Sequence, residues 1–217
     1  MGKDMTYYRI MDFTKNECCP ICSLVNYQTK QAMDGFLYES VNDPAIRKEL
    51  SKSGGLCNYH SDMLCRMGDP LAHAIIYSDL ICDVIQQLSK PFGHTYNKGD
   101  CYFCKEAIKG EEIYENAFLT YFEEAEFSEH YRQNGVLCAR HLFAILSLGT
   151  KNGGYSERVA NEIKDATVEK YKKLIGQLEE IRRKNDYRFS EEPWSEGAKD
   201  SWQRAVNIIN DRAGTRK

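Results

Sequence analysis

The chain has 217 residues, of which 42% are hydrophobic and 12% aromatic, which is enough to fill a core and excludes disorder as the default. Its 29 basic and 32 acidic residues give a formal charge of −3, and Lys and Arg form no block before the far C-terminus, which argues against a nucleic-acid partner. No run of about 18 apolar residues predicts a membrane span, and the N-terminus lacks the apolar core of a signal peptide. We therefore expect a cytoplasmic protein with no membrane partner.

The first elements of the chain combine a cysteine pair with helical periodicity. Cys19 and Cys22 form a CxxC pair, and the apolar positions over residues 25–41 follow the stripe of an amphipathic helix. Pro44 follows an aspartate and predicts the start of a short helix over residues 44–54.

A CxxH element comes next, at Cys57 and His60. It begins another short helix, and Gly68 is suited to end that helix as a C-cap. Pro70 then opens a longer helix, for which the sequence predicts an apolar stripe. The stripe consists of Leu71, Ala74, Ile75, Ser78, Ile81, Ile85 and Leu88.

The same order of elements occurs a second time. Cys101 and Cys104 repeat the CxxC pair 82 residues after the first, and Cys138 and His141 repeat the CxxH element 81 residues after the first. Matching pairs in the same order, at nearly the same spacing, indicate an internal duplication. Gly149 occupies the position equivalent to Gly68 and is expected to end its helix in the same way.

The duplication predicts an all-α fold built from two tandem pseudo-repeats, because no alternating strand pattern is found. The long helix of the second copy is expected to begin with Ser156 as N-cap and to run toward Arg183. The predicted organisation is a first repeat (1–90), a linker (91–100), a second repeat (101–189), and a C-terminal turn with a short helix (190–217).

The paired motifs favour metal binding over redox chemistry. A thioredoxin-type dithiol needs no third or fourth partner, whereas here each CxxC is followed by its own CxxH. Three thiolates and one imidazole form a standard tetrahedral set for structural zinc, and each predicted Cys3His site ties helix N-termini together. We expect two zinc ions, with an iron–sulfur cluster as the alternative. The candidate ligands are Cys19, Cys22, Cys57, His60, Cys101, Cys104, Cys138 and His141.

The pairing of these motifs stays open. Each site could form within one copy, or Cys19 and Cys22 could meet Cys138 and His141 in an exchanged arrangement. The separations of 34 and 33 residues between CxxC and CxxH favour one helical hairpin per metal.

The other candidate groups are given structural interpretations. Cys65 and Cys82 lie on apolar stripes and are predicted to be buried thiols, and Cys18 is predicted to be a spare thiol beside the first pair. A run of carboxylates at helical spacing is expected to be a solvated face. The run comprises Glu111, Glu112, Glu115, Glu123, Glu124 and Glu126.

The C-terminal segment contains both tryptophans of the chain, Trp194 and Trp202. They lie in a Pro-containing turn and a short amphipathic helix with a stripe of Trp202, Ala205, Val206 and Ile209. The favoured interpretation is that this helix folds back and caps the core. The alternative is a docking segment for a protein partner or a second subunit.

The chain resembles a bacterial and archaeal family described only as a domain of unknown function. The resemblance rests on the CPxC opening, the Gly-Leu-Cys-x-x-His element, the Gly-Asp-Pro-Leu run and the segment "NDYRFSEEPWSEGAKDSWQRAV". It covers nearly the whole chain and implies no specific activity. The second knuckle, "CYFC", lacks the proline of the first but keeps both thiols.

Three classes of function remain. A zinc-stabilised adaptor or assembly factor, with a protein partner or as a homodimer, is favoured because a saturated Cys3His site leaves no open coordination position. The second class is an iron–sulfur or thiol-based redox or metal-handling protein. An enzyme ranks third, because the sequence has no phosphate loop, no HExxH, no Gly-x-Ser-x-Gly elbow and no kinase motif set.

Overall fold

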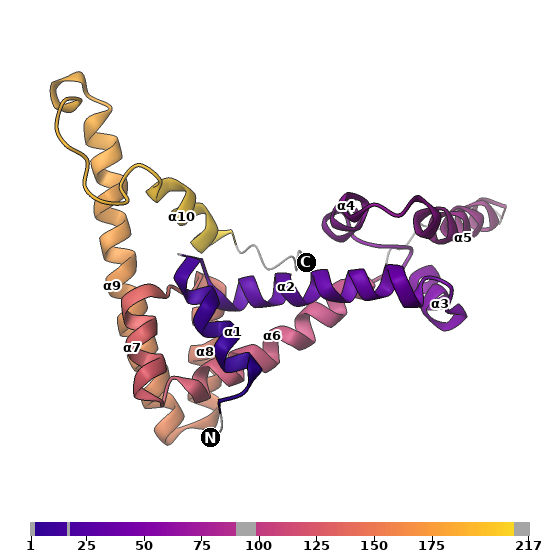
Figure 1. Ribbon diagram of the computed structural model, residues 1–217, viewed down its shortest axis with the longest axis horizontal. Helices are drawn as coiled ribbons and strands as arrows, with labels where there is room; N and C mark the ends of the chain where they lie inside the picture. Colours follow the sequence, from indigo (N-terminus) through magenta and orange to yellow (C-terminus); the bar gives the residue numbers. More distant parts are fainter. Residues whose placement is uncertain (1–2, 17, 90–98, 211–217) are drawn as a thin grey trace. The chain divides into compact units, whose positions relative to one another are not determined.

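The computed structural model describes residues 3–16, 18–89 and 99–210 (Figure 1). No strand occurs in these ranges, so the all-α prediction is confirmed. Residues 91–98 of the predicted linker lie outside the described residues. The helices are α1 Met5–Phe13, α2 Pro20–Gly35, α3 Pro44–Lys52, α4 Asn58–Met67, α5 Pro70–Leu88, α6 Tyr102–Tyr121, α7 Ala125–Asn134, α8 Ala139–Asn152, α9 Gly154–Lys184 and α10 Ser201–Ile209. None of these described helices combines the length and apolar composition that crossing a membrane requires.

Contacts divide the chain into two compact units that cut across the sequence copies. The described part of unit 1 comprises residues 3–24 and 111–210, and that of unit 2 comprises residues 25–89 and 99–110. The division falls inside α2 and inside α6. Each unit therefore takes its CxxC from one copy and its CxxH from the other.

Unit 2 is built around the contact between the C-terminal end of α2 and the N-terminal end of α6. The ring of Phe36, in a short π-helical segment that continues α2, packs edge-on against Phe103 of α6 with 5.6 Å between centroids. Helices α3, α4 and α5 cover this contact with their apolar faces. The core residues are Met33, Phe36, Val41, Leu50, Leu56, Leu64, Ala72, Ile76, Cys101 and Phe103.

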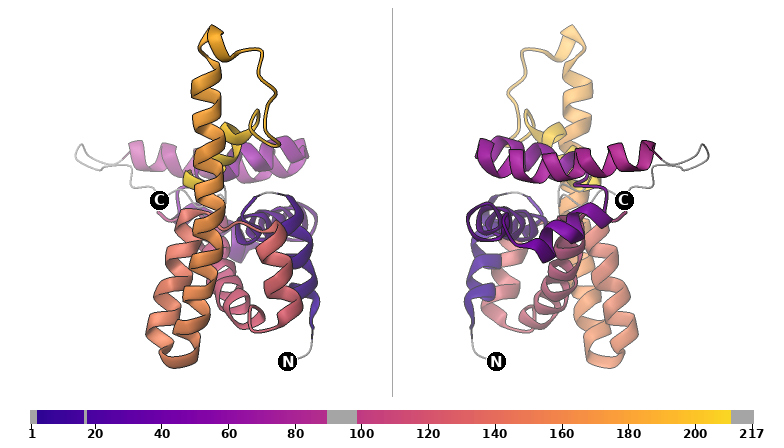
Figure 2. Two further views of the ribbon diagram at one scale, coloured as in Figure 1. Left: turned by 90° about the vertical axis from the view of Figure 1, so that its left-hand side faces the viewer. Right: turned by 90° about the vertical axis from the view of Figure 1, so that its right-hand side faces the viewer.

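Unit 1 is built around aromatic side chains and the long antiparallel pair α8 and α9 (Figure 2). Phe118 packs edge-on against Phe127 and Tyr131, with centroids 5.3 and 5.2 Å apart. The Tyr131 hydroxyl is buried and lies 2.7 Å from Thr167 Oγ1 of α9, and it accepts a hydrogen bond from Leu137 N just before α8. The buried Tyr131 side chain therefore holds the segment just before α8, which positions the candidate ligands Cys138 and His141.

The predicted helix starts at Pro44 and Pro70 and the predicted helix end at Gly68 agree with the structure, which also shows an aspartate cap before each proline. The Asp43 carboxylate accepts a hydrogen bond from Ala45 N at the start of α3, and Asp69 accepts one from Ala72 N at the start of α5. Gly68 ends α4 with φ 88°, a left-handed backbone that favours glycine. These predictions are confirmed.

Two boundary predictions in the second copy are wrong. Gly149 does not end its helix, because α8 continues to Asn152 and Gly153 is the C-cap. Instead Gly149 is buried against α9, where a Cβ atom would lie 2.5 Å from Ala160 Cβ. The following helix begins at Gly154 rather than after Ser156, so a position equivalent in sequence serves close helix packing instead of helix termination.

Of the predicted apolar stripe of α5, Ile75 alone packs against the core, and the other six residues are exposed. Ala72 and Ile76 are the buried residues of this helix, whereas Leu71, Ile81 and Leu88 are exposed. The core-facing side also makes one ion pair and one hydrogen bond to α3. Arg47 donates to both carboxylate oxygens of Asp79 at 2.6 Å, and Ser51 Oγ donates to Asp83 at 2.5 Å. The helix therefore has a second apolar side that the core does not use.

The C-terminal segment folds back on α9, as the favoured interpretation predicts, but through a different face. Ser201 and Ile208 of α10 are buried, whereas Trp202, Val206 and Ile209 are 54%, 38% and 69% exposed. The predicted stripe therefore points away from the helix bundle of unit 1.

The turn before α10 is held by polar groups of α9. Lys184, which is buried, donates to the Pro193 carbonyl at 2.6 Å and lies 4.4 Å from the ring centroid of Trp194. Glu180 accepts a hydrogen bond from Ser195 N, and Gln177 Nε2 donates to the Glu196 carbonyl. Hydrogen bonds from Lys184 and Ser195 lower the pKa of Glu180 to about 2.

Candidate metal centres

The first cluster of candidate ligands, called site 1, lies in unit 1 and consists of Cys19, Cys22, Cys138 and His141. Cys19 immediately precedes α2 and Cys22 lies in its first turn; Cys138 is the N-cap of α8 and His141 lies in its first turn. The first turn closes normally in each helix, since Ser23 N donates to the Cys19 carbonyl and Leu142 N to the Cys138 carbonyl. A side chain just before a helix folds over the third helical residue, so this spacing brings both members of each motif together.

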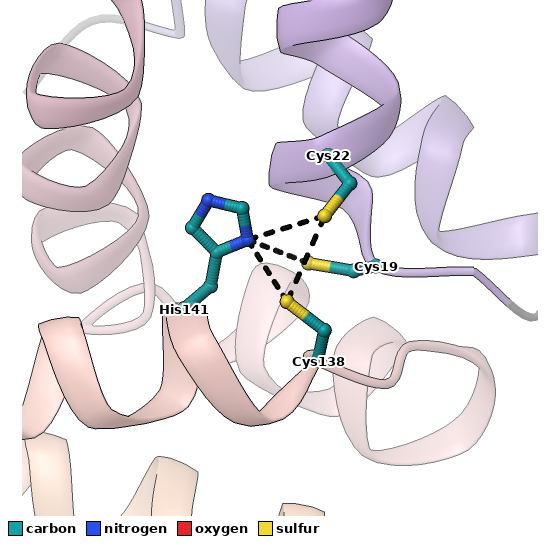
Figure 3. Close-up of side chains that lie close together, drawn as sticks. All are labelled: Cys19, Cys22, Cys138 and His141. Atoms are coloured by element: carbon teal, nitrogen blue, oxygen red, sulfur yellow. Dashed lines mark hydrogen bonds between the residues drawn. The ribbon is translucent and has the colours of Figure 1, made fainter. Parts of the chain in front are cut away.

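The side chains of site 1 converge on one point (Figure 3). The Sγ atoms of Cys19, Cys22 and Cys138 lie 3.3, 3.3 and 3.1 Å from His141 Nδ1, and the Sγ atoms of Cys22 and Cys138 are 3.6 Å apart. A tetrahedron with zinc-like bond lengths has sulfur–sulfur edges of about 3.8 Å and sulfur–nitrogen edges of about 3.5 Å. The four atoms therefore have the spacing of ligands to a single metal ion.

The second cluster, called site 2, lies in unit 2 and consists of Cys57, His60, Cys101 and Cys104. It uses the same helix positions, since Cys57 is the N-cap of α4 and Cys101 immediately precedes α6. His60 Nδ1 is 3.3, 3.5 and 3.4 Å from the Sγ atoms of Cys57, Cys101 and Cys104. The Cys57 and Cys104 sulfurs are 3.7 Å apart, again the edge of a tetrahedron rather than the bond of about 2.05 Å in a disulfide.

Both sites are exchanged between the copies, and the preference for a site within each copy is wrong. Site 1 joins the first CxxC to the second CxxH, and site 2 joins the second CxxC to the first CxxH. Helix lengths give the reason. The 16 residues of α2 carry the chain about 24 Å from Cys19, and the nine residues of α3 return at most about 14 Å. In the second copy the shortfall is larger, since the 20 residues of α6 span about 30 Å and the ten of α7 about 15 Å.

Carboxylates and an arginine surround the imidazole of site 1. With Nδ1 turned to the sulfurs, a neutral imidazole carries its proton on Nε2, which lies 3.4 Å from Glu111 Oε1 and 3.9 Å from Glu115 Oε1. Glu111 is buried and pairs with both terminal nitrogens of Arg140. A carboxylate behind a metal-binding histidine fixes its tautomer and ring orientation.

The surroundings of site 2 are different. His60 Nε2 is buried and has no hydrogen-bond partner within the described part of the chain. The imidazole packs instead against the rings of Tyr59 and Phe103, with centroids 5.2 and 6.0 Å away. Cys57 and Cys104 are partly exposed, whereas all four candidate ligands of site 1 are buried. The thiols of site 2 are therefore more accessible to solvent than those of site 1, and its histidine has no hydrogen bond from a described residue to fix its orientation.

In site 1 the thiolate of Cys19 and the imidazolium of His141 stabilise each other, whereas the pKa values of the Cys22 and Cys138 thiols are raised. Burial disfavours the thiolate of Cys19, but contacts with Cys138, Cys22 and His141 outweigh it and hold the pKa of Cys19 well below its usual value. Burial likewise disfavours the imidazolium, yet the neighbouring sulfurs raise the pKa of His141 to about 10. Burial also raises the pKa of the Glu115 carboxyl. A metal ion that binds here displaces the imidazole proton.

The structure also locates residues outside the two clusters. Cys65 and Cys82 are exposed, so the prediction of buried thiols is wrong, and Cys18 is half-buried with Asn207 Nδ2 3.8 Å from its sulfur. Sequence reasoning assigned Glu111 to a solvated face, which is also wrong. The available signal was Arg140, a basic residue inside the CxxH motif that needs a nearby carboxylate if it is partly buried.

Comparisons with known proteins agree with the resemblance seen in the sequence. The chain is 33% identical over 210 residues to an uncharacterized 23.9 kDa protein in the xynA 3′ region of Caldicellulosiruptor sp. (strain Rt8B.4), covering 93% of this chain and 97% of that protein. No solved structure matches the chain. The model of the family of unknown function DUF6062 matches residues 1–99 and 93–216. With matches spanning nearly its whole length, the chain belongs to the DUF6062 family.

Proposed function

We propose that the protein binds two zinc ions as structural staples, one at each site, and that the stapled helices serve as an adaptor or assembly factor for a protein partner. The single observation that carries the proposal is the convergence of three sulfurs and one imidazole nitrogen at tetrahedral spacing in both units. Such a set fills the four positions of structural zinc and leaves none for a substrate or an activated water.

The ligand spacing favours a single metal ion over an iron–sulfur cluster. In a four-iron cluster each thiolate binds a different iron, so the ligand atoms stand farther apart than the edge of one metal's tetrahedron. The observed edges of 3.1 to 3.7 Å are those of a mononuclear site. Thiolate sites of this kind persist in a reducing compartment, and the proposal keeps the cytoplasmic location expected from the sequence.

The position of the ligands favours a structural role for the metal. Every ligand lies at the start of a helix, where backbone N–H groups and the helix dipole stabilise negative charge. One metal in each unit fastens two such helix starts that are far apart in sequence. Metal-binding energy is then folding energy.

The binding role rests on the exposed apolar face of α10. Trp202, Val206 and Ile209 follow one another at helical spacing and are exposed, although the opposite face of the same helix is packed. Tryptophan is enriched among the anchors of protein interfaces. This face suits an apolar groove on another protein.

Metal analysis of the purified full-length protein tests the zinc part of the proposal. We expect about two zinc per chain and no visible absorption. Stoichiometric iron with visible absorption would instead support the redox alternative, and protein without any bound metal would contradict both.

The adaptor part is tested by affinity purification from the native cell. The wild-type chain is compared with Trp202→Lys, and with Phe143→Lys as a control at another exposed aromatic residue. We expect a stoichiometric partner that is lost from the first variant and retained by the second. Recovery of the wild-type chain without such a partner would contradict the adaptor role.

A further inference from the structure

The side of α5 that faces away from its own unit is apolar except at Ser78. The outer stripe of α5 is defined as Leu71, Ala74, Ser78, Ile81, Ile85 and Leu88. All six residues are exposed, and the four large ones are 71%, 58%, 57% and 79% exposed in chain order. A surface helix with one apolar side already in the core normally presents polar residues on the other side. The outer stripe is therefore a second packing surface.

The spacing of the outer stripe identifies the kind of surface. Its residues are separated alternately by three and four positions, the repeat of a coiled-coil seam, from Leu71 to the end of α5 at Leu88. The helix runs straight over this length (Figure 2). The partner that fits such a seam is another helix with the same repeat.

Charge does not oppose pairing of α5 with a copy of itself. The helix contains no Lys or Arg, and its acidic residues, Asp79 and Asp83, are held on the opposite side by Arg47 and Ser51. The polar member of the outer stripe, Ser78, donates its hydroxyl hydrogen to the Ile75 carbonyl within the helix. The stripe can therefore be buried without an unpaired charge or a stranded hydroxyl donor.

The outer stripe is also complementary to itself about a two-fold axis at its centre. In an antiparallel pair Leu71 lies opposite Leu88, Ala74 opposite Ile85, and Ser78 opposite Ile81, so small and large side chains alternate across the seam. A parallel pair would place Ala74 and Ser78 opposite their own copies and leave gaps there. Small-against-large pairing fills an interface without voids, and the same surface on both subunits makes a closed dimer.

We propose that α5 pairs in antiparallel fashion with α5 of a second copy of this chain, and that the protein is a dimer through the outer stripe of α5. The proposal goes beyond the metal staples and the adaptor role, because it assigns a self-association surface to unit 2. It uses none of the metal ligands and none of the exposed residues of α10.

Mass measurement of the full-length, metal-loaded protein tests the dimer. Sedimentation equilibrium should give twice the chain mass of 25.0 kDa for the wild type. The double variant Ile81→Glu, Ile85→Glu should raise the dimer dissociation constant by about 100-fold or more, because it places four carboxylates in the seam. Ile175→Glu, at an exposed isoleucine of α9, is the matched control and should remain a dimer.

Circular dichroism and metal content establish that the double variant is folded, as expected for exposed positions. A monomeric wild type would overturn the proposal and assign the stripe to another occupant, either the rest of the same chain or a different protein. A dimer that survives the double variant would overturn it as well.

Disulfide trapping tests the antiparallel orientation. In a Cys65→Ser, Cys82→Ser background, which removes the two exposed native thiols, the pair Leu71→Cys with Leu88→Cys should cross-link two chains under mild oxidation. Leu71→Cys alone should not, because the two copies of residue 71 would be about 25 Å apart along an antiparallel pair. Cross-linking by the single variant would demonstrate a parallel seam, and no cross-linking by either variant would exclude the seam.

Discussion

Sites 1 and 2 have the same donor set at the same helix positions but different surroundings. Site 1 is fully buried and has Glu111 and Arg140 behind its imidazole, whereas site 2 has partly exposed thiols and a buried His60 Nε2 without an acceptor. The difference teaches that the duplication preserved the ligands and the helix starts but not the groups that support them. If both sites bind the same metal, site 1 should hold it more firmly.

The largest expected effect comes from removing a thiol ligand from each site in turn. Cys138→Ala should lose about one of two metals and unfold much of unit 1, because metal-binding energy of about 10 kcal/mol or more contributes directly to folding in small zinc domains. Cys57→Ala should lose the other metal and affect unit 2. Metal content measures the loss of each ion, and helix content and melting temperature measure the unfolding of each unit. A Cys138→Ala protein unchanged in all three would rule out the metal staple in unit 1.

The next effect is the order in which the sites give up metal to a coloured chelator. We expect two phases, with site 2 releasing first by about 10-fold or more, because its ligands are more accessible and its histidine lacks a hydrogen bond worth roughly 1 to 3 kcal/mol. Cys57→Ala should abolish the fast phase and Cys138→Ala the slow one. The reverse assignment of phases would mean that the surroundings do not set metal retention.

Substitution of Glu111, which lies behind the ligand His141, should reduce the difference in metal affinity between the two sites. Glu111→Gln removes the charge that faces His141 Nε2 and Arg140, and it should weaken metal binding at site 1 by about 10- to 100-fold without changing site 2. Glu112→Gln, at the exposed neighbouring position, is the control and should have no effect. Competition with a chelator of known affinity measures the metal affinity of both variants. Equal behaviour of the two variants would show that Glu111 does not support the site.

A smaller effect is expected at the glycine that changed its role between the copies. Gly149→Ala places a methyl group against Ala160 and the Ser156 carbonyl, and it should destabilise unit 1 by about 1 to 3 kcal/mol. Gly176→Ala on α9 meets no atom within 4 Å and should stabilise the helix by about 0.5 to 1 kcal/mol. Denaturant unfolding measures both values. A neutral Gly149→Ala would mean that α8 and α9 can separate at no cost.

Much of the fold could be predicted because its signals are local. The helix starts depend on Asp43, Asp69 and the paired motifs, whose side chains act within one turn, and the all-α class follows from periodicity. The eight residues singled out from the sequence are the ones that gather in the two clusters. Their spacing within each motif is also a local property, since it reflects the geometry of a first helical turn.

The remaining features depend on tertiary structure that spacing does not encode. The exchange between copies follows from the unequal lengths of α2 and α3, which matter only once the direction of each helix is known. The α5 prediction failed because that helix has two apolar sides, and periodicity alone does not say which one meets the core. Glu111 was missed because a buried carboxylate looks the same as its solvated neighbours until Arg140 is placed beside it.

Metal content of paired variants tests the exchanged staple most directly. If each metal joins the first copy to the second, Cys19→Ala combined with Cys138→Ala removes two ligands of one site, and the protein should retain about one metal per chain. Cys19→Ala combined with Cys57→Ala removes one ligand from each site and should leave no tightly bound metal. The opposite result, with one metal retained by the second pair and none by the first, would contradict the exchange and return each site to a single copy.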